Sequence, residues 1–419
     1  MTTTRQDCLA RDAADPLREL RDLFDLPEGT IYLDGNSLGV MPRATPQRVA
    51  QVVQDEWGRD LIKSWNTAGW IHLPQRVGDK IAQLVGAGPG ELVVADSTSV
   101  NLFKVLTAAL RITDEDAPER NVIVSERSNF PTDLYIAEGL ARSQGYELVL
   151  VEPDEIAAHL NERLAVLMLT QVNYRTGRVH DMAALTAAAH RAGALVVWDL
   201  CHSAGAIPVD LTGADADFAV GCGYKYLNGG PGAPAFVWAH PRHAGRFWQP
   251  LSGWMGHAEP FEFTPEYRPA TGITRYLCGT PPVISLAALE CGVDTLLAAQ
   301  PLGGLAALRR KSIALTELFI ELVESRCQGH GLSLASPRDA GIRGSQVCFA
   351  HESGGYAMVQ ALIARGVIGD FRAPDVLRFG FTPLYTSHAD VWDAVEHFVQ
   401  VLEKEEWREA RFNQRAAVT

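Results

Sequence analysis

The middle of the chain alternates short runs of β-branched and other apolar residues with longer segments rich in Ala and Leu. The apolar runs predict seven strands, at residues 92–95, 121–125, 147–151, 165–170, 194–199, 218–221 and 235–238. The segments between them predict helices, among them 101–112, 132–144 and 182–192. Continuously apolar strands separated by helices are typical of a mostly parallel sheet that is covered on both faces. The alternation therefore predicts an α/β fold with a large, mostly parallel seven-stranded sheet.

The pattern changes near residue 282, and the rest of the chain predicts a smaller α+β domain. Helical patterns and short strands follow one another there, at 283–298, 305–328, 346–350, 355–364, 377–381 and 388–405. A chain of 419 residues has room for two or three domains. We expect three parts: an N-terminal segment (1–45) that packs on the small domain and the ligand site, a large domain (46–285) and a small C-terminal domain (286–419).

Charge and cysteine content narrow the class of protein. The 37 basic and 50 acidic residues give a net charge of −13, which disfavours a protein that coats nucleic-acid phosphates. The N-terminus lacks the apolar stretch of a signal peptide, and no run approaches the roughly 18 apolar residues of a membrane helix. Seven scattered cysteines form no Cys-x-x-Cys pair and are typical of reduced thiols. We expect a soluble cytoplasmic protein without a metal, nucleic-acid or membrane partner.

The loop after the predicted strand 218–221 carries Lys225 between Tyr224 and Tyr226, just before a run of glycines. A lysine at the mouth of an apolar sheet is either an ion-paired structural residue or a reactive amine. Near aromatic rings and dipoles its pKa can be lowered, and it can form a Schiff base with a carbonyl. The phosphate-binding pattern Gly-x-x-x-x-Gly-Lys-Ser/Thr is absent. Because ligands of open α/β sheets bind at the carboxyl ends of the strands, Lys225 is a candidate site residue.

Asp199 ends the preceding predicted strand, and His202 follows three residues later. Alone, the pair would be read as a helix-capping aspartate and a hydrogen-bonded histidine. Beside Lys225 another interpretation is favoured, because a carboxylate that bonds a pyridinium N–H makes that ring an electron sink. An acid, a histidine and a lysine on successive strand ends indicate a pyridoxal 5′-phosphate site.

Two strand-to-helix junctions complete such a site. Thr98 and Ser99 would place hydroxyls and backbone N–H groups at a helix N-terminus, which attracts a phosphate. Simple N-capping by Ser99 is the alternative. At the next junction, Phe130 is a candidate plate for a planar cofactor. Its alternative is a core aromatic that precedes Pro131 in a first helical turn.

Together these motifs resemble the kynureninase family of fold-type I pyridoxal-phosphate enzymes. The likeness runs through residues 32–39 (Tyr-Leu-Asp-Gly-Asn-Ser-Leu-Gly), 64–66, 130–133, 172–177, 224–232, 251–254 and 383–385. It implies hydrolysis of L-kynurenine, and with it 3-hydroxykynurenine, to anthranilate or 3-hydroxyanthranilate and L-alanine. Two residues depart from the pattern: Cys201 stands where alanine is expected, and Gly223 where a small hydroxylated residue is common.

The resemblance also implies roles for single residues. Lys225 would hold the cofactor and move protons, Asp199 would pair with the ring nitrogen, and Tyr224 would donate or relay a proton, with Lys225 as the competing donor. The other implied cofactor contacts are Thr98, Ser99, Phe130, Pro131, Thr132, Asp133, Thr170, His202, Trp254 and Thr280. Thr280 would reach the site from the partner subunit of a homodimer.

Three further residues are implied to bind the substrate. Arg378 would clamp its α-carboxylate, since a guanidinium matches a carboxylate bidentately; a surface ion pair is the alternative. Asn36 and Trp65 would line the pocket for the aryl ring, and for Trp65 the alternative is a buried packing residue.

Two other functions stay open. A cysteine desulfurase or a related aminotransferase-like enzyme would share the fold, but such desulfurases typically carry histidine directly before the lysine, where this chain has Tyr224. They also use a cysteine on a mobile loop, whereas Cys327 and Cys348 lie in a predicted helix and strand. A protein that binds the cofactor without catalysis is the third reading, and the joint presence of Lys225, Asp199 and Arg378 argues against it.

Overall fold

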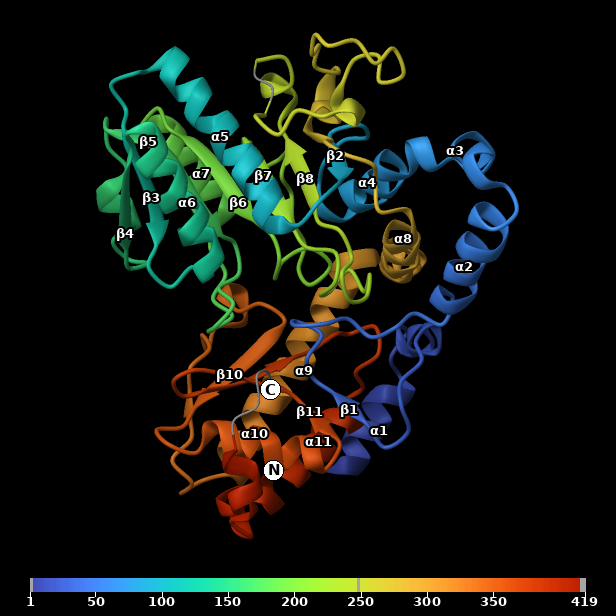
Figure 1. Ribbon diagram of the computed structural model, residues 1–419. Coiled ribbons are helices and arrows are strands. Elements are labelled where there is room, and N and C mark those ends of the chain that lie inside the picture. The colour runs from blue at the N-terminus through green and yellow to red at the C-terminus, as the bar shows by residue number, and fades with distance from the viewer. Residues whose placement is uncertain (1–2, 247–248, 415–419) are drawn as a thin grey trace.

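A seven-stranded sheet forms the centre of the larger part of the molecule in the computed structural model, which describes residues 3–246 and 249–414 (Figure 1). The strand order is β2–β8–β7–β6–β5–β3–β4, and only β8 runs antiparallel to its neighbours. The strands are β2 (Leu92–Val94), β3 (Val122–Glu126), β4 (Glu147–Val151), β5 (Leu164–Thr170), β6 (Leu195–Asp199), β7 (Phe218–Gly221) and β8 (Phe236–Ala239). The predicted α/β class with a mostly parallel seven-stranded sheet is confirmed.

Helices cover both faces of this sheet, which explains why its inner strands are apolar up to their carboxyl ends. The covering helices are α4 (Leu73–Val85), α5 (Thr98–Asp116), α6 (Pro131–Gln144), α7 (Met182–Arg191) and α8 (Val283–Leu297). Successive residues of β6 point to opposite faces: Val196 and Trp198 join the core under α4, α7 and α8, and Val197 joins the core under α5 and α6. Strand side chains alternate in this way, so a strand covered on both faces has no polar side.

The smaller part is built on a four-stranded antiparallel sheet of order β12–β13–β10–β9. Its strands are β9 (Ser333–Leu334), β10 (Gln346–Ala350), β12 (Asp370–Arg372) and β13 (Val376–Gly380), and its helices are α9 (Gly304–Arg326), α10 (Gly355–Ala364) and α11 (His388–Glu403). A core rich in phenylalanine, with Phe319 touching Phe349, Phe379 and Phe381, joins α9 to the sheet.

The N-terminal segment lies against this smaller part although it is far away in sequence (Figure 1). Helix α1 (Arg5–Ala13) packs on α11, and β1 (Ile31–Tyr32) pairs in parallel with β11 (Val367–Ile368). Gly39 then reaches the sheet-bearing part, where its N–H donates to the carbonyl of Tyr224 at 2.8 Å. A side chain on Gly39 would collide with the backbone of Lys225, so glycine is required for this approach.

Helix α8 connects the two parts and packs on α4 and on α2 (Thr45–Gln51). Residues 283–302 form the one described segment that is long and apolar enough to cross a membrane. Within that segment, Glu290 and Asp294 bind Arg76 and Lys80 of α4, while the opposite face is buried in the core, as in a core helix. The predicted three-part division of the chain, with a boundary at residue 286, stays a prediction.

Candidate active site

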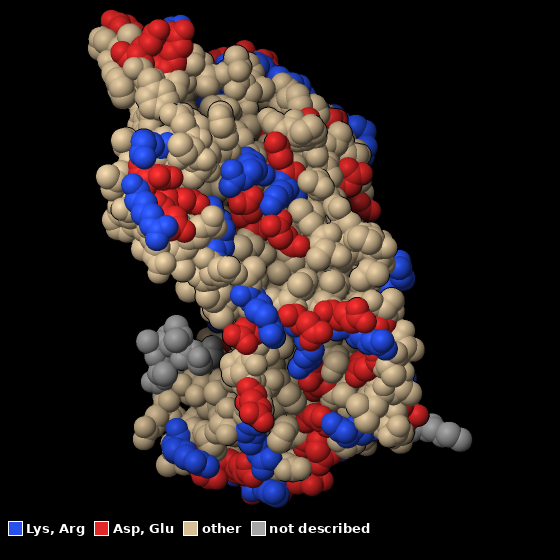
Figure 2. All heavy atoms as spheres, turned by 90° about the vertical axis from the view of Figure 1, so that its right-hand side faces the viewer, with Lys and Arg blue, Asp and Glu red and all other residues tan. Residues whose placement is uncertain are grey.

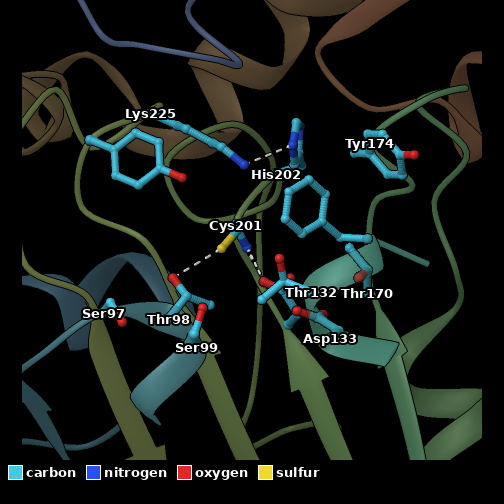
Figure 3. Close-up of a pocket in the computed structure, with 13 residues that line it drawn as sticks. Ser97, Thr98, Ser99, Thr132, Asp133, Thr170, Tyr174, Cys201, His202 and Lys225 are labelled. Atoms are coloured by element: carbon cyan, nitrogen blue, oxygen red, sulfur yellow. Dashed lines mark hydrogen bonds between the residues drawn. The ribbon is translucent and has the colours of Figure 1, made fainter. Parts of the chain in front are cut away.

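A cavity of about 130 Å³ lies where β5, β6 and β7 end and where α5 and α6 begin (Figure 3). Its lining residues are Ser97, Thr98, Ser99, Phe130, Thr132, Asp133, Thr170, Tyr174, Asp199, Cys201, His202, Tyr224 and Lys225. Parallel strands bring their carboxyl ends to one edge of the sheet, so residues spread over 129 positions of sequence meet there. Most of the residues predicted for the cofactor are therefore neighbours in space.

Lys225 extends into the cavity from the loop after β7. Its Nζ lies 3.0 Å from Nε2 of His202 and 5.8 Å and 5.7 Å from the ring centres of Phe130 and Tyr224. Burial favours the neutral amine, but the acidic groups around it, Cys222 first, outweigh burial and raise the pKa of Lys225. The pKa of Lys225 is thus raised and not lowered, and the amine is a cation.

The close packing around Gly223 explains why this chain has glycine where the family pattern has a small hydroxylated residue. A Cβ at this position would lie 2.4 Å from the carbonyl oxygen of Pro234, so the backbones pass too closely for any side chain. There is no room for the hydroxylated residue expected at this position, so the loop that carries Lys225 has glycine there.

The imidazole of His202 is neutral and its two nitrogens have different roles. It is fully buried, and burial together with the charge of Lys225 holds its pKa well below the usual range. An ammonium group can only donate, so Nε2 accepts from Lys225 and the proton lies on Nδ1, which donates to Oε1 of Gln346 at 3.1 Å. His202 therefore links the lysine to the smaller part of the molecule.

Two carboxyl groups meet at the floor of the cavity and differ in charge. Oδ1 of Asp199 accepts a hydrogen bond from the N–H of Cys201 at 2.6 Å, within the turn that follows β6. Because no helix begins there, Asp199 is not a helix cap. Burial, followed by the charge of Asp199, raises the pKa of Asp133 well above its usual range. Oδ2 of Asp133 has no hydrogen-bond partner among the described residues. The floor therefore holds one anion next to one neutral acid.

The phosphate-binding turn predicted after β2 is the first turn of α5. Ser97, and not Ser99, is the N-cap: its hydroxyl accepts from the N–H of Val100 at 3.4 Å. The capping alternative for Ser99 is thus wrong. Thr98 and Ser99 lie in the first turn with their hydroxyls toward the cavity (Figure 3), where N–H groups without helical acceptors carry partial positive charge.

Phe130 stands against the cavity and not in the core, because 41% of its surface is exposed. Its ring meets Tyr174 edge to face at 5.3 Å. Asn129 joins the start of α6 to the end of β5, because its Oδ1 accepts hydrogen bonds from the N–H of Phe130 at 2.6 Å and from the hydroxyl of Thr170. Pro131 begins α6 and does not line the cavity.

Arg378 and Asn36 lie in a buried cluster outside this cavity. Arg378 is 1% exposed, so the alternative of a surface ion pair is wrong. Its bidentate partner is Asp370, and it also donates to the carbonyl of Tyr174 at 2.7 Å and to Ser37 Oγ at 2.8 Å. The side-chain amide of Asn36 is fully buried and has no partner within the described chain.

Trp65 and Trp254 line a second, larger cavity of about 950 Å³ together with Phe261, Phe263 and Ile62. The two indoles meet edge to face at 5.7 Å. Trp65 is half-buried and faces this cavity. Thr280 is exposed on a loop and lines neither cavity.

Three lining residues were absent from the predicted set: Ser97, Tyr174 and Cys201. The N-cap serine could have been found from the serine that directly precedes Thr98, and Tyr174 from its place four residues after the end of β5. Cys201 stood out in the sequence as a departure but was given no role. No group of three or more His, Cys, Asp or Glu side chains arranged to hold a metal occurs within residues 3–246 and 249–414.

Comparison with known proteins points to one family. A family model described as "Kynureninase C-terminal domain" matches residues 308–398. Kynureninase from Pseudomonas fluorescens is 57% identical over 420 residues, covering 100% of both chains. Kynureninase from Burkholderia pseudomallei strain 1106a is 57% identical over 419 residues, covering 99% of this chain and 100% of the relative.

Among solved structures, the apo form of a cysteine desulfurase from Thermococcus onnurineus NA1 has a TM-score of 0.78 at 18% identity, covering 96% of this chain and 100% of that one. The cystine C-S lyase C-DES, in complex with its reaction product cysteine persulfide, has a TM-score of 0.77 at 17% identity, covering 89% and 98%. At this identity the likeness concerns the fold, and it confirms the predicted fold-type I architecture.

Proposed function

This chain belongs to the kynureninase family, and we propose that it hydrolyses L-kynurenine to anthranilate and L-alanine with pyridoxal 5′-phosphate as its cofactor. 3-Hydroxykynurenine, which would give 3-hydroxyanthranilate, is a further substrate of the proposal. The observation that carries it is the 57% identity to a kynureninase over the whole chain, joined to a cavity that holds Lys225, Asp199 and Phe130 together.

The cavity suits pyridoxal phosphate at each end. Lys225 offers an amine for the aldehyde, Asp199 a carboxylate for the ring nitrogen, and Phe130 a face for the ring. Thr98 and Ser99, at the start of α5, offer hydroxyls and N–H groups for the phosphate. Asp133 has an unpartnered oxygen at the floor, which a polar edge of a bound ring would satisfy.

When bound, pyridoxal phosphate supplies an electron sink for the bonds around the substrate's α-carbon. In the proposal, residues of this chain hold the cofactor ring in place and move protons. Asp199 would face the ring nitrogen, neutral Asp133 would add no second charge there, and Phe130 and Thr170 would lie against the ring. Lys225, next to neutral His202, would move protons at the substrate carbons.

Tyr224 is the proposed donor for the γ-carbonyl oxygen as water adds to the γ-carbon. It lines the cavity beside Lys225, and burial raises its pKa to about 12, so the phenol keeps its proton at neutral pH. A phenol held in this form can donate a proton or pass one on. Lys225 is the competing donor.

Arg378 is proposed to bind the substrate's α-carboxylate. Asp370 already occupies its Nε and Nη2, while Nη1 has only the carbonyl of Tyr174 among the described residues, so one N–H of Nη1 is left for a substrate oxygen. Asn36, with its unpartnered buried amide, and Trp65, in the wall of the second cavity, are proposed to receive the aryl part.

A homodimer completes the proposal. Trp57, Leu61, Ile62 and Ile284 are exposed apolar side chains, and Trp57 and Ile284 line one surface hollow. On the side of the molecule that carries α2, residues other than Lys, Arg, Asp and Glu cover broad areas between patches of charge (Figure 2). Patches of this kind mark protein interfaces. On this reading Thr280 reaches the phosphate of the partner subunit's site, which would account for its position outside the first cavity. Trp254, which lines the second cavity, keeps its proposed role as a phosphate contact.

The remaining parts of the proposal concern the setting of the reaction. We place the enzyme in the cytoplasm, in tryptophan catabolism by the kynurenine pathway and in NAD biosynthesis, without nucleic-acid or membrane partners. The three-part division of the chain is also kept as a proposal. Its N-terminal segment (1–45) contacts both other parts, through α1 on α11 and Gly39 on Tyr224.

Absorbance and product analysis test the proposal together. The purified chain should be yellow, its band should change on addition of kynurenine, and anthranilate and alanine should appear in equal amounts. Lys225→Ala should lose the band of the bound aldehyde and the products. An unchanged band in Lys225→Ala would sink the cofactor assignment.

The same assay separates the other two functions. A cysteine desulfurase would release sulfide from cysteine, and a silent binding protein would give the band without product. Cys327 and Cys348, the candidates for a desulfurase cysteine, are both buried in the smaller part, Cys348 within β10. If the chain released sulfide from cysteine and no anthranilate from kynurenine, the proposed function would be wrong and a cysteine desulfurase would take its place.

A further inference from the structure

Two cysteines lie side by side under the floor of the first cavity. β6 and β7 are parallel neighbours with Asp199 opposite Val220, and Cys201 and Cys222 each follow two residues later, just beyond the strand ends. Neighbouring strands lie about 4.8 Å apart, and disulfides join residues whose Cα atoms are about 4.4–6.8 Å apart. The strand register therefore places these two residues within reach of a disulfide.

The side chain of Cys222 points toward Cys201. Its Sγ donates to the carbonyl of Cys201 at 3.8 Å, and the two thiols are close enough to shift each other's pKa. Sγ of Cys201 contacts Oγ1 of Thr98 at 3.6 Å across the cavity floor (Figure 3). Cys201 lines the cavity and is the accessible member of the pair, while Cys222 lies behind it.

The electrostatic surroundings differ between the two thiols. Burial acts to raise the pKa of Cys222, but the hydrogen bond from the Cys201 thiol and the charge of Lys225 outweigh burial and lower it. The same hydrogen bond is the main cause that raises the pKa of Cys201. Cys222 is thus the member that forms a thiolate more readily, and a thiolate is the form that attacks sulfur.

We propose that Cys201 and Cys222 form a reversible disulfide, with a hydroperoxide as the oxidant, when the cavity holds no cofactor. The Cys201 thiol first passes its proton to the neighbouring Cys222 thiolate, and the Cys201 thiolate attacks one peroxide oxygen. The O–O bond breaks, and the departing hydroxide takes the proton back from Cys222 and leaves as water. The Cys222 thiolate then attacks the oxidised sulfur, the S–S bond forms, and the S–O bond breaks to release hydroxide, which takes up a proton from solvent. Two thiols and one hydrogen peroxide give one disulfide and two waters.

A filled cavity protects this pair, because a ligand over Cys201 excludes the peroxide. The disulfide draws Cys201 away from Thr98, at the turn proposed to hold the phosphate. This protection rests on the proposed function, whereas disulfide formation in the cofactor-free chain does not, so the two can fail separately.

Peptide mass analysis tests the proposal without an activity assay. Both cysteines lie in one tryptic peptide, residues 192–225, which contains no internal Lys or Arg. The full chain, with its cofactor and after its removal, is treated with hydrogen peroxide, alkylated and digested. In the cofactor-free chain this peptide should be two hydrogens lighter and unalkylated, and dithiothreitol should restore both alkylation sites. In the loaded chain the oxidised fraction should be lower by about tenfold.

Variants identify the partners. Cys201→Ala, which introduces the residue typical of the family, and Cys222→Ala should each leave an alkylatable cysteine in the peptide. Cys348→Ala, which removes a buried thiol of the smaller sheet, should leave the disulfide unchanged. If Cys222→Ala fails to fold, Cys201→Ala alone still shows whether Cys201 is a partner in the disulfide. Full alkylation of both cysteines in the oxidised, cofactor-free chain would overturn the proposal, as would a dithiothreitol-resistant sulfinic acid in place of the disulfide.

Discussion

The two cavities differ in how completely one chain encloses them. In the first, the polar residues at the strand ends are buried and hydrogen-bonded, as His202 is to Lys225 and Gln346. In the second, the walls are apolar and open: Ile62 is 76% exposed and Phe263 75%. A parallel sheet can build the chemical end of the site alone, because its strand ends converge. The end proposed for the aryl ring rests on loops and a short helix, and a second subunit is proposed to close it.

The largest effect is expected at the floor of the first cavity, where the two carboxyl groups carry different charges. Asp199→Asn removes the anion proposed to face the ring nitrogen, and kcat for kynurenine should fall by about 10²–10³-fold. Asp133→Asn is the matched control: the raised pKa of Asp133 means that the acid is already neutral, so an amide of the same shape should keep kcat within about threefold. Equal losses in the two variants would contradict this assignment of charge.

The proposed contribution of the partner subunit is tested by mixing subunits. Lys225→Ala removes the amine, and Thr280→Glu places a carboxylate where a phosphate is proposed, so each variant alone should be inactive. If Thr280 serves the partner's site, a dimer with one chain of each kind has one intact site. Co-expression should then restore about one quarter of wild-type activity, since half of randomly formed dimers are mixed and each has one working site of two. Mixed dimers without activity would place Thr280 in its own subunit's site.

Sequence alone predicted the first cavity better than the second, for a physical reason. Lys225, Asp199, Phe130 and Thr98 could be brought together from spacing, because successive parallel strands end at one edge of the sheet. The neutral state of Asp133 could not be predicted, since it depends on burial and on the closeness of another carboxyl group.

The hydrogen-bond partners of Arg378 could not be predicted from the sequence either. Its pairing with Asp370 follows from the antiparallel register of β12 and β13, which sets those two residues opposite each other. That register depends on the turn between the strands, and the pattern of the sequence predicted only the second of them. The exposed loop of Thr280 carries no pattern that fixes its position.

Tyr224 allows the proton relay to be tested within the first cavity. Tyr224→Phe keeps the ring and removes the phenol that the raised pKa keeps protonated, so kcat should fall by about 10²-fold while the absorbance band is retained. Tyr226→Phe is the matched control two residues on. Its buried hydroxyl donates to the carbonyl of Ser345 at 3.2 Å and lines neither cavity, so its loss should lower stability by about 1 kcal/mol and spare kcat. Full turnover by Tyr224→Phe would leave Lys225 as the donor.

The smallest effect concerns stability in the cluster around Arg378. Burial, followed by the charge of Asp370, raises the pKa of Asp34 to about 8 from an ordinary value of 3.8, and Oδ1 of Asp34 has no partner among the described residues. The unfolded chain therefore releases this proton from about pH 4 upward, while the folded chain keeps it until about pH 8. Proton release favours unfolding across that window, so this carboxyl group lowers the free energy of unfolding as the pH rises from about 4 to about 8.

Asp34→Asn isolates that contribution, because the amide mimics the neutral acid and does not titrate. The difference in Tm between variant and wild type, measured by thermal denaturation at a series of pH values, should become more positive between about pH 4 and pH 8 and then stay constant. Above pH 8 both folded and unfolded wild-type chains carry the charge, which is why the difference stops growing. A Tm difference that does not change with pH would mean that Asp34 is ionised in the folded chain, and that the arginine cluster balances two carboxylates and not one.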